Sequence, residues 1–434
     1  MASTGLSRTC TQGNNKTATL SVWLKRGSGF GVEQYILGFG LIAGAYTQIA
    51  FDSSNTILVY NFSGGGVLDI RSYAKRRDPS AWLHFCVAFD SSQNTESNRI
   101  KYYINGTQVT GSELDVNYPA LNADCVFNNN GQPCTVGMHN SSGGYYNGSM
   151  AMMEWVDGLQ LDPTYFGSFD SNTGIWTPTA TSTISDYGVN GFKLAMDTTT
   201  PGADTSGKGN TFTASGTPTL LQGNPQNNWC TMNPLDVTKG AGTTVYTNGN
   251  TTVSISNSER NASRSSVAFT TGKFYSECKV ISVGGDVRIG VMGIDGTTAQ
   301  PVNFGDNTNP YYFEYGYSYR NSGQKENNNS SSSYGASYTA GNIIGVAFDA
   351  TNGSITFYKD GATQGVAFSS LSSNTWAFYC TLLGVNQVSW NFGEGFFGTT
   401  AAGTNADGNG QGLFAYAVPS GYYALNTKNL EAYG

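Results

Sequence analysis

The chain has 434 residues, of which 38% are apolar and only 12% charged, with 56 glycines and 12 prolines. An aromatic content of 13% excludes a disordered chain, and the many Asn, Ser, Thr and Gly residues exclude a mainly helical one. A net charge of −7 excludes a basic face for nucleic acid. No apolar run reaches about 18 residues, so we expect no membrane insertion.

Alternation of apolar and polar residues with period two indicates a first β-module over residues 1–170. Its first strand spans 17–24 and places Leu20, Val22 and Leu24 on one face. The dipeptide Asn105-Gly106 predicts a tight hairpin. Strands at this spacing favour a β-sandwich, and the others are predicted at 35–39, 47–51, 57–60, 82–89, 99–104 and 146–155.

A second β-sandwich is predicted over 243–398, after a Pro-, Gly- and Thr-rich connector with one edge strand at 171–242. The polar run 324–333 predicts an exposed loop, and Asp360-Gly361 predicts another hairpin. Residues 399–434 are expected to form a C-terminal tail. The fold class is therefore all-β, with two jelly-roll sandwiches.

Several motifs resemble known families in order and spacing. The segments TLSVWLKR (19–26), WLHFCVAFD (82–90) and GSMAMMEWVDGLQLDPTYFG (148–167) resemble a laminin G-like, concanavalin A-type jelly roll. The segments GNIIGVAFDATNGSITFYKDG (341–361) and VSWNFGEGFF (388–397) resemble a SPRY domain. The tandem is similar to virion surface proteins of tailed bacteriophages, especially marine ones.

Catalysis is not expected from the carboxylates of the first module. Concanavalin A-type folds also host glucanases, which need two carboxylates on one strand face. The candidate pair here is Glu154 and Asp157, whose spacing of three places them on opposite faces. His84 lies in an apolar strand and His139 in a polar loop, and neither accompanies a nucleophile motif. We predict that the protein is not an enzyme.

No cofactor is predicted, with a calcium ion as the alternative that the laminin G-like resemblance implies. Asp52 and Asp90 are the ligand types for it, but each also fits a turn that closes a strand. Cys125 and Cys134 flank a polar loop, where a disulfide and two free thiols are both compatible with the sequence.

Two loops are candidate ligand-binding sites, because glycan binding needs exposed aromatic faces beside polar side chains. The first contains Asn140, Tyr145, Tyr146 and Asn147. The second contains Tyr317, Tyr319 and Arg320, and SPRY domains bind partners through loops at one end of the sandwich. The tyrosines of the second loop alternate along a strand, so packing of one face against the sheet is the alternative.

The resemblance implies a non-enzymatic structural protein of a phage virion, whose function as a tail fibre is to bind a host cell-surface glycan or protein. The alternatives are a capsid decoration or head-fibre protein and, third, a glycan-degrading enzyme. The expected partners are other virion proteins and further copies of the chain, with a trimer favoured. The N-terminus lacks the apolar stretch of a signal peptide, so we expect synthesis in the host cytoplasm and location in the virion.

Overall fold

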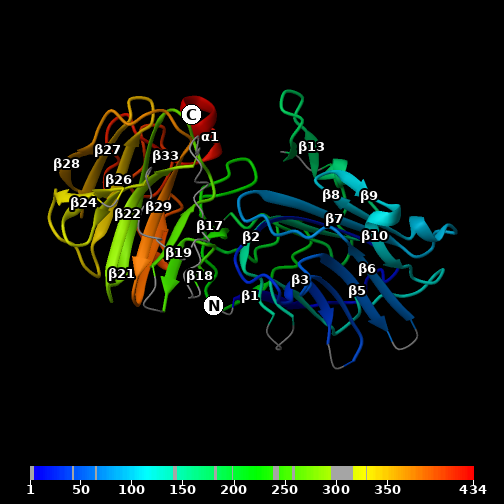
Figure 1. Ribbon diagram of the computed structural model, residues 1–434. Coiled ribbons are helices and arrows are strands. Elements are labelled where there is room, and N and C mark those ends of the chain that lie inside the picture. The colour runs from blue at the N-terminus through cyan, green and yellow to red at the C-terminus, as the bar shows by residue number, and fades with distance from the viewer. Residues whose placement is uncertain are drawn as a thin grey trace. The chain divides into compact units, whose positions relative to one another are not determined.

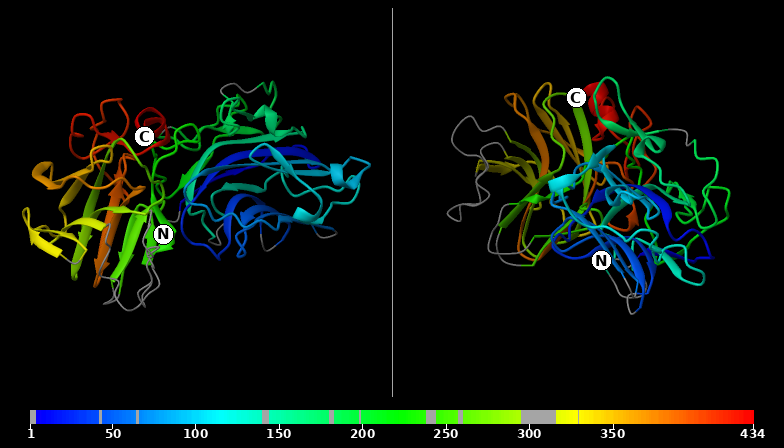
Figure 2. Two further views of the ribbon diagram at one scale, coloured as in Figure 1. Left: turned by 45° about the horizontal axis from the view of Figure 1, so that its top comes forward. Right: turned by 90° about the vertical axis from the view of Figure 1, so that its right-hand side faces the viewer.

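The computed structural model describes residues 4–434 except 42–43, 64–65, 140–143, 180–182, 198, 238–243, 257–259, 295–315 and 329. The chain divides into two compact units, Met1–Leu220 (unit 1) and Leu221–Gly434 (unit 2). Each unit consists of two stacked layers of strands (Figures 1 and 2). The predicted all-β fold with two sandwiches is confirmed.

Unit 1 is built from two large antiparallel sheets and one short pair of strands. The eight-stranded sheet has the order β10 (Leu114–Asn117), β6 (Gly66–Ser72), β5 (Ile57–Ser63), β4 (Tyr46–Phe51), β3 (Gln34–Gly40), β11 (Pro133–Val136), β1 (Gly5–Thr9), β16 (Thr213–Ser215). The six-stranded sheet has the order β15 (Phe192–Leu194), β12 (Gly148–Asp157), β2 (Thr17–Arg26), β7 (Trp82–Asp90), β8 (Ile100–Ile104), β9 (Thr107–Val109). The short pair is β13 (Gly167–Phe169) with β14 (Trp176–Pro178).

Unit 2 has the same two-layer plan. The seven-stranded sheet has the order β17 (Met232–Val237), β20 (Arg260–Ser265), β29 (Trp376–Leu383), β22 (Asp286–Gly293), β23 (Gly316–Arg320), β24 (Gln324–Asn327), β25 (Ser330–Ser333). The second sheet has the order β18 (Thr244–Thr247), β19 (Thr252–Ile255), β30 (Asn386–Asn391), β21 (Lys273–Ser282), β26 (Ile343–Asp349), β27 (Ser354–Lys359), β28 (Ala362–Phe368). The remaining elements are β33 (Tyr423–Ala424), which pairs with β21, the pair β31 (Phe396–Phe397) and β32 (Thr400–Ala401), and the helix α1 (Thr427–Tyr433).

Three further single-turn 3-10 helices lie in unit 1, at Glu96–Asn98, Gly111–Glu113 and Pro163–Tyr165. Among the described residues no helix is long and apolar enough to cross a membrane.

The two predicted hairpin turns are present. Asn105 and Gly106 both have positive φ, 46° and 75°, between β8 and β9. Asp360 and Gly361 have φ of 49° and 80° between β27 and β28. Two consecutive residues with positive φ form the turn whose twist matches antiparallel strands, and Asn, Asp and Gly adopt it at the lowest cost. These turns fix the register of both hairpins.

The core of unit 1 lies between its two large sheets. Leu20, Val22 and Leu24 point into it and are at most 1% exposed, as the alternation predicts. The opposite face of β2 is also buried, because Trp23 packs in a cluster with Trp176 of β14. The described residues between Leu161 and Tyr187 therefore cover the outer face of the six-stranded sheet.

His84 shows how closely this covering segment fits. Its Nδ1 accepts a hydrogen bond from Trp176 Nε1 at 3.0 Å, and its Nε2 lies 2.8 Å from Ser21 Oγ. Since Nδ1 accepts, the neutral ring carries its proton on Nε2 and donates to Ser21. Burial lowers the pKa of His84 to about 3. The imidazole therefore joins the six-stranded sheet to the segment that covers its outer face.

In unit 2 the C-terminal residues cover the outer face of β21. Phe414 and Ala424 pack with Tyr275, and all three are at most 1% exposed. The buried carboxylate of Glu277 accepts hydrogen bonds from the backbone N–H groups of Ala415 (2.8 Å) and Tyr416 (2.9 Å). The segment 399–434, expected as a tail, thus packs in part against the sandwich, and its strand β33 (Tyr423–Ala424) pairs with β21.

The segment 171–242, predicted as a connector, is divided between the two units. Strands β14, β15 and β16 join unit 1, and β17 joins the seven-stranded sheet of unit 2. Short strands with few apolar residues show little alternation of apolar and polar side chains, so the sequence does not reveal them. Their pairing depends on the sheets that they join.

The seven cysteines are all buried, free thiols. Cys125 and Cys134 do not form a disulfide. The neighbour of Cys134 is Cys10, and a hydrogen bond from the Cys134 thiol lowers the pKa of Cys10 despite burial.

Replacing His84 tests the covering layer of unit 1. The folded imidazole stays neutral where the unfolded one, with a pKa of about 6.5, gains a proton. The unfolded state therefore binds more protons below that pH, and stability falls as the pH is lowered. We expect the free energy of unfolding of His84→Gln to fall by about 2 kcal/mol less than that of the wild type between pH 7 and pH 5.

Urea unfolding at the two pH values measures this difference. Ser21→Ala disturbs the same contact without removing the titrating group, so it must keep the wild-type pH dependence. An unchanged pH dependence in His84→Gln contradicts the structural role of the neutral imidazole.

Candidate functional site

The first candidate loop is fastened to the sandwich by its own backbone and side chains. Asn140 lies outside the described residues. Tyr146 donates from its hydroxyl to the carbonyl of Lys25 at 3.0 Å, and burial raises the pKa of this phenol. Asn147 accepts a hydrogen bond on its carbonyl from Gly27 N at 2.7 Å. Tyr145 is partly exposed. Tyr146 and Asn147 therefore hold the loop in place and do not present a free aromatic face.

The second candidate segment begins in β23, where the tyrosines are packing residues. Tyr319 is fully buried, and its ring lies 5.0 Å from Tyr338 and 5.5 Å from Phe357 between ring centroids. Tyr317 packs edge-on against Phe368 with centroids 5.1 Å apart. Packing against the sheet, the alternative for these tyrosines, is what the structure shows.

Arg320 belongs to a cluster of charged side chains on one face of the seven-stranded sheet. Its Nε donates to Asp286 at 2.7 Å, and Arg260 donates to the same carboxylate at 2.6 Å. Arg288 pairs with both Asp286 and Glu326. Burial alone would raise the pKa of Asp286, but Arg288 and Arg260 outweigh it and hold that pKa below its ordinary value. Arg320 is therefore a structural cation that is about one-third exposed.

The polar run 324–333 is a β-hairpin and not the predicted loop. Gln324–Asn327 (β24) pairs with Ser330–Ser333 (β25), and β24 pairs in turn with β23. Asn328 in the turn has φ of 44°, a conformation that Asn tolerates. The hairpin forms because Glu326 is anchored by Arg288 and because backbone pairing with β23 does not need apolar side chains.

The hairpin ends in an exposed strand that we name the β25 edge, residues Ser330–Ser333. All four serines are exposed. β25 is the last strand in its sheet, and none of the other described strands pairs with its outer side. Such a strand carries unpaired N–H and C=O groups that can pair with another chain.

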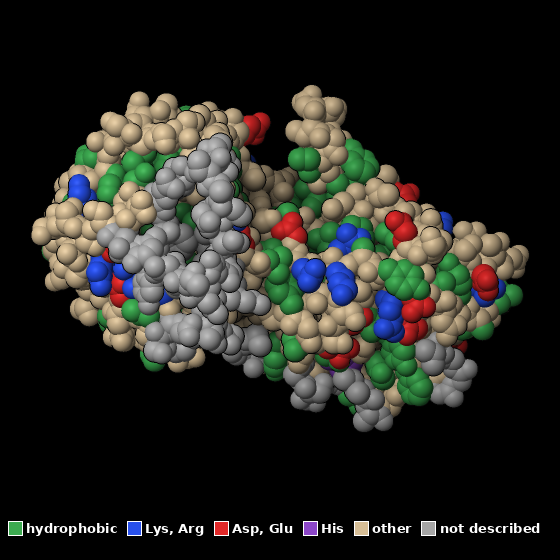
Figure 3. Space-filling model, in the orientation of Figure 1, with side chains coloured by type: hydrophobic (Ala, Val, Ile, Leu, Met, Phe, Trp, Pro, Cys, Tyr) green, Lys and Arg blue, Asp and Glu red, His purple; other side chains and the backbone are tan. Residues whose placement is uncertain are grey.

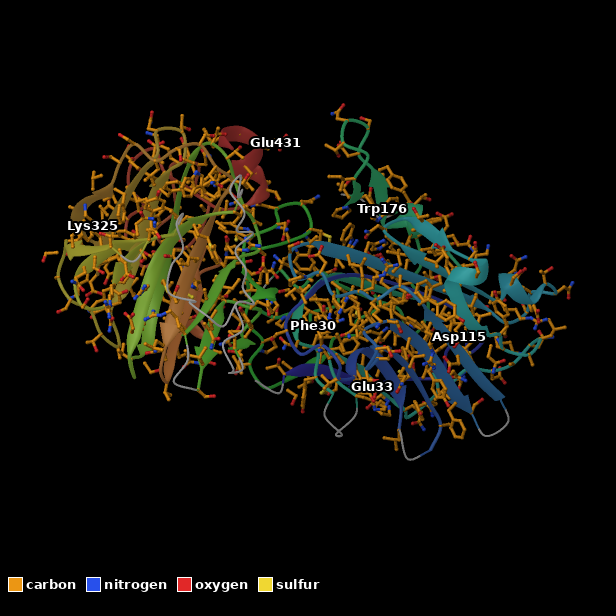
Figure 4. All side chains as sticks on the ribbon, in the orientation of Figure 1. Phe30, Glu33, Asp115, Trp176, Lys325 and Glu431 are labelled. Atoms are coloured by element: carbon orange, nitrogen blue, oxygen red, sulfur yellow. The ribbon has the colours of Figure 1, made fainter. Side chains whose placement is uncertain are left out.

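Side chains on both flanks hold this edge rigid. Lys325, labelled in Figure 4, donates from Nζ to the carbonyl of Ala367 at 2.6 Å. Tyr334 donates from its hydroxyl to the carbonyl of Gly365, and Ala336 N donates to Gln364 Oε1 at 2.9 Å. The residues after β25 are thus tied to β28 of the other sheet. A polar hairpin held at both ends keeps its edge in one place.

The carboxylates considered for catalysis lie on opposite faces of β12, as their spacing predicts. Glu154 accepts from the Tyr187 hydroxyl at 2.5 Å and pairs with Lys193 at 3.3 Å. Asp157 accepts from the backbone N–H groups of Asn14 and Asn190, both at 2.9 Å. Each carboxylate therefore serves packing between segments.

Asp52 and Asp90 close turns with their own chain. Asp52 Oδ1 accepts from the N–H groups of Ser54 and Thr56, both at 2.9 Å, and Asp90 Oδ1 accepts from Ser92 N at 3.0 Å. The described part of the chain contains no group of three or more His, Cys, Asp or Glu residues placed to hold a metal ion.

The β25 edge was missed by the sequence analysis because its side chains carry no period-two pattern. The available signal was the Asn run at 327–329 between two polar runs, because Asn tolerates the positive φ that a tight turn requires. Charged side chains are few in the sequence, at 12% of the residues, and they lie scattered between other groups on the face shown in Figure 3.

Comparison with known proteins identifies both domains. Residues 251–395 match the SPRY domain model, and residues 3–159 match the model of the concanavalin A-like lectin/glucanases superfamily. Ran-binding protein 9 of Danio rerio is 31% identical over 129 residues, which are 28% of this chain and 20% of that protein. The Ran-binding proteins 9/10 homolog of Drosophila melanogaster is 33% identical over 127 residues, 28% of this chain and 12% of that protein. The chain thus spans a fifth or less of the length of these relatives.

Two solved structures are similar to parts of the chain. The SPRY domain of human HERC1 is 15% identical and covers 37% of this chain and 96% of that chain, with a TM-score of 0.30. The SAP-like pentraxin of Limulus polyphemus is 14% identical and covers 37% of this chain and 72% of that chain, with a TM-score of 0.28.

The predicted function in a bacteriophage virion is wrong. The curated relatives reported above are animal proteins named Ran-binding proteins 9 and 10, which points away from a phage tail fibre. The chain contains a concanavalin A-like domain and a SPRY domain.

Replacing Asp286 tests the charged cluster beneath Arg320. In Asp286→Asn, three arginines keep only Glu326 as a counter-charge, and removal of one partner from a buried cluster costs about 3–5 kcal/mol. We expect a loss of this size in the free energy of unfolding of unit 2, measured by urea unfolding. Glu431→Gln, on the exposed face of α1 (Figure 4), is the matched control and must stay within about 0.5 kcal/mol of the wild type. A loss below about 1 kcal/mol in Asp286→Asn contradicts the cluster's structural role.

Proposed function

We propose that the chain is a non-enzymatic protein-interaction protein, whose SPRY domain binds an extended segment of a protein partner along the β25 edge. The observation that carries this proposal is an exposed, rigidly held edge strand within the domain that matches the SPRY model. An added strand gains its affinity from backbone hydrogen bonds and its specificity from side chains at alternate positions.

The composition of the edge suits strand addition. Serine side chains are short, so they leave room for a partner strand to approach the backbone of Ser330–Ser333. The four serines are uncharged, so the edge does not repel a partner of either charge. Natural sheets usually protect such edges with Lys, Pro or a bulge, and the residues of β25 are none of these.

The outer face of one central strand of the SPRY domain is covered by the chain itself. The outer face of β21 is covered by Phe414 and Ala424, and Glu277 fastens that covering layer. A partner therefore meets edges and loops before it meets an apolar sheet face.

The names of the relatives support a protein as the class of partner. Ran-binding proteins 9 and 10 are named for binding Ran, and the match to them spans 28% of this chain. Ran is accordingly one probe in the experiment, while the proposal concerns an extended protein segment in general. The absence of enzymatic activity remains part of the proposal.

Proline substitutions in β25 test the proposal. The N–H groups of a strand alternate between its two sides, so only one of Ser331 and Ser332 directs its N–H outward. A display library of 15-residue peptides is screened on the full chain, and purified Ran is measured separately. We expect enriched peptides to bind the wild type and to lose at least tenfold in affinity when proline removes the outward N–H.

Thermal unfolding separates the two variants, because the inward proline breaks pairing with β24 and lowers the melting temperature. The outward proline must leave the melting temperature close to that of the wild type. Thr363→Pro, in the exposed edge strand β28, is the control and must keep peptide affinity. Peptides that bind both serine variants as well as the wild type, or a library without enriched peptides, overturn the proposal.

A further inference from the structure

Unit 1 contains a groove that is separate from the two candidate ligand-binding loops. Its larger part has a volume of about 620 Å³, within the ~300–1,000 Å³ typical of ligand pockets. A smaller part of about 240 Å³ shares Ala45, Val126 and Asn129 with it, so the two parts are continuous. The shape therefore favours an elongated ligand.

Asn61 of β5 is the polar group at the floor of this groove. It is 4% exposed and lines the larger part. Its Oδ1 accepts from the backbone N–H of Val126 at 2.8 Å and from Thr47 Oγ1 at 2.7 Å. Because a backbone N–H can only donate, the orientation of the amide is fixed. The Asn61 Nδ2 group then points away from these donors, and it has no hydrogen-bond partner among the described residues.

Further amides follow the rim in a fixed order. Gln12 Nε2 donates to Asn15 Oδ1 at 2.7 Å, and Asn15 Nδ2 donates to Asn129 Oδ1. This relay leaves Gln12 Oε1 as an acceptor and Asn129 Nδ2 as a donor at the groove. The groove thus offers donors and an acceptor along its length.

The lining also excludes several ligand classes. Among the described residues that line the larger part, Asp124 is the one charged side chain. Lys16 Nζ lies 3.8 Å from its carboxylate and balances its charge, so the groove does not favour a phosphate or another ion. No aromatic ring is among the described residues that line either part, so a sugar has no face on which to stack. Leu68, Pro119 and Val126 provide apolar contact instead.

From this lining we infer that the groove binds an extended, uncharged peptide segment with a small apolar side chain, whose backbone carbonyl accepts a hydrogen bond from Asn61 Nδ2. Peptide groups supply the alternating acceptors and donors that the amide relay requires, and the apolar wall takes the side chain. A carbonyl of such a ligand would give Asn61 Nδ2 the acceptor that it lacks among the described residues. This site is in unit 1 and is independent of the β25 edge.

The test follows the side-chain amide signals of the full chain labelled with ¹⁵N-asparagine. Acetyl-Ala-Val-Ala-methylamide, maltose and inorganic phosphate are titrated separately. We expect the peptide alone to shift the Asn61 signal in a saturable way. Ala120→Trp fills the exposed rim of the groove and must weaken peptide binding at least tenfold.

Two variants keep the test specific. Ala81→Trp places the same ring at an exposed alanine outside the groove and must leave binding unchanged. Asn61→Asp keeps an oxygen acceptor for Val126 N but replaces the Nδ2 donor with a second oxygen, so this variant must lose peptide binding. If Asn61→Asp does not fold, Ala120→Trp still tests the inference. A shift of Asn61 by maltose or phosphate alone, no shift with the peptide, or full peptide affinity in Ala120→Trp overturns the inference.

Discussion

The central strands of both units carry side chains that are buried on both faces. On β2, Leu20 and Val22 face the core while Trp23 packs beneath Trp176. On β21, Cys278 faces the core while Tyr275 and Glu277 face the C-terminal layer. An antiparallel sheet can leave its outer face in water, but an outer face that carries large side chains such as Trp23 or Tyr275 needs a covering segment from elsewhere in the chain. Burial on both faces is the constraint on which the remaining structure depends.

This constraint decides which surfaces are left for partners. The outer face of the six-stranded sheet in unit 1 is covered by described residues between Leu161 and Tyr187, and the outer face of β21 in unit 2 is covered by the C-terminal segment. Hydrogen bonds to buried groups, such as those from Ala415 and Tyr416 to Glu277, make the cover part of the fold. The surfaces left for partners include the β25 edge in the SPRY domain and the groove in the concanavalin A-like domain, both lined mostly by uncharged residues.

The sequence predicted the parts of the fold that period two and turn chemistry control. The strand at 17–24 and the turns Asn105-Gly106 and Asp360-Gly361 were predicted correctly because these signals are local. The hairpin at 324–333 was missed because its polar side chains carry no period-two pattern and because Glu326 is held by Arg288, which is distant in sequence. The burial of Tyr319 was one of two alternatives, and the alternation itself pointed to it. The predicted function was wrong because the order of the motifs was taken to indicate phage virion proteins, whereas the curated relatives reported above are animal Ran-binding proteins.

Hydrogen–deuterium exchange of the full chain, with and without a captured peptide, tests the central claim most directly. In the free chain the account predicts slow exchange in β21 and fast exchange of the outward amides of Ser330–Ser333. In the complex it predicts new protection at those serine amides and unchanged exchange in β28. Protection that appears elsewhere in the SPRY domain, with no change in β25, would contradict the account.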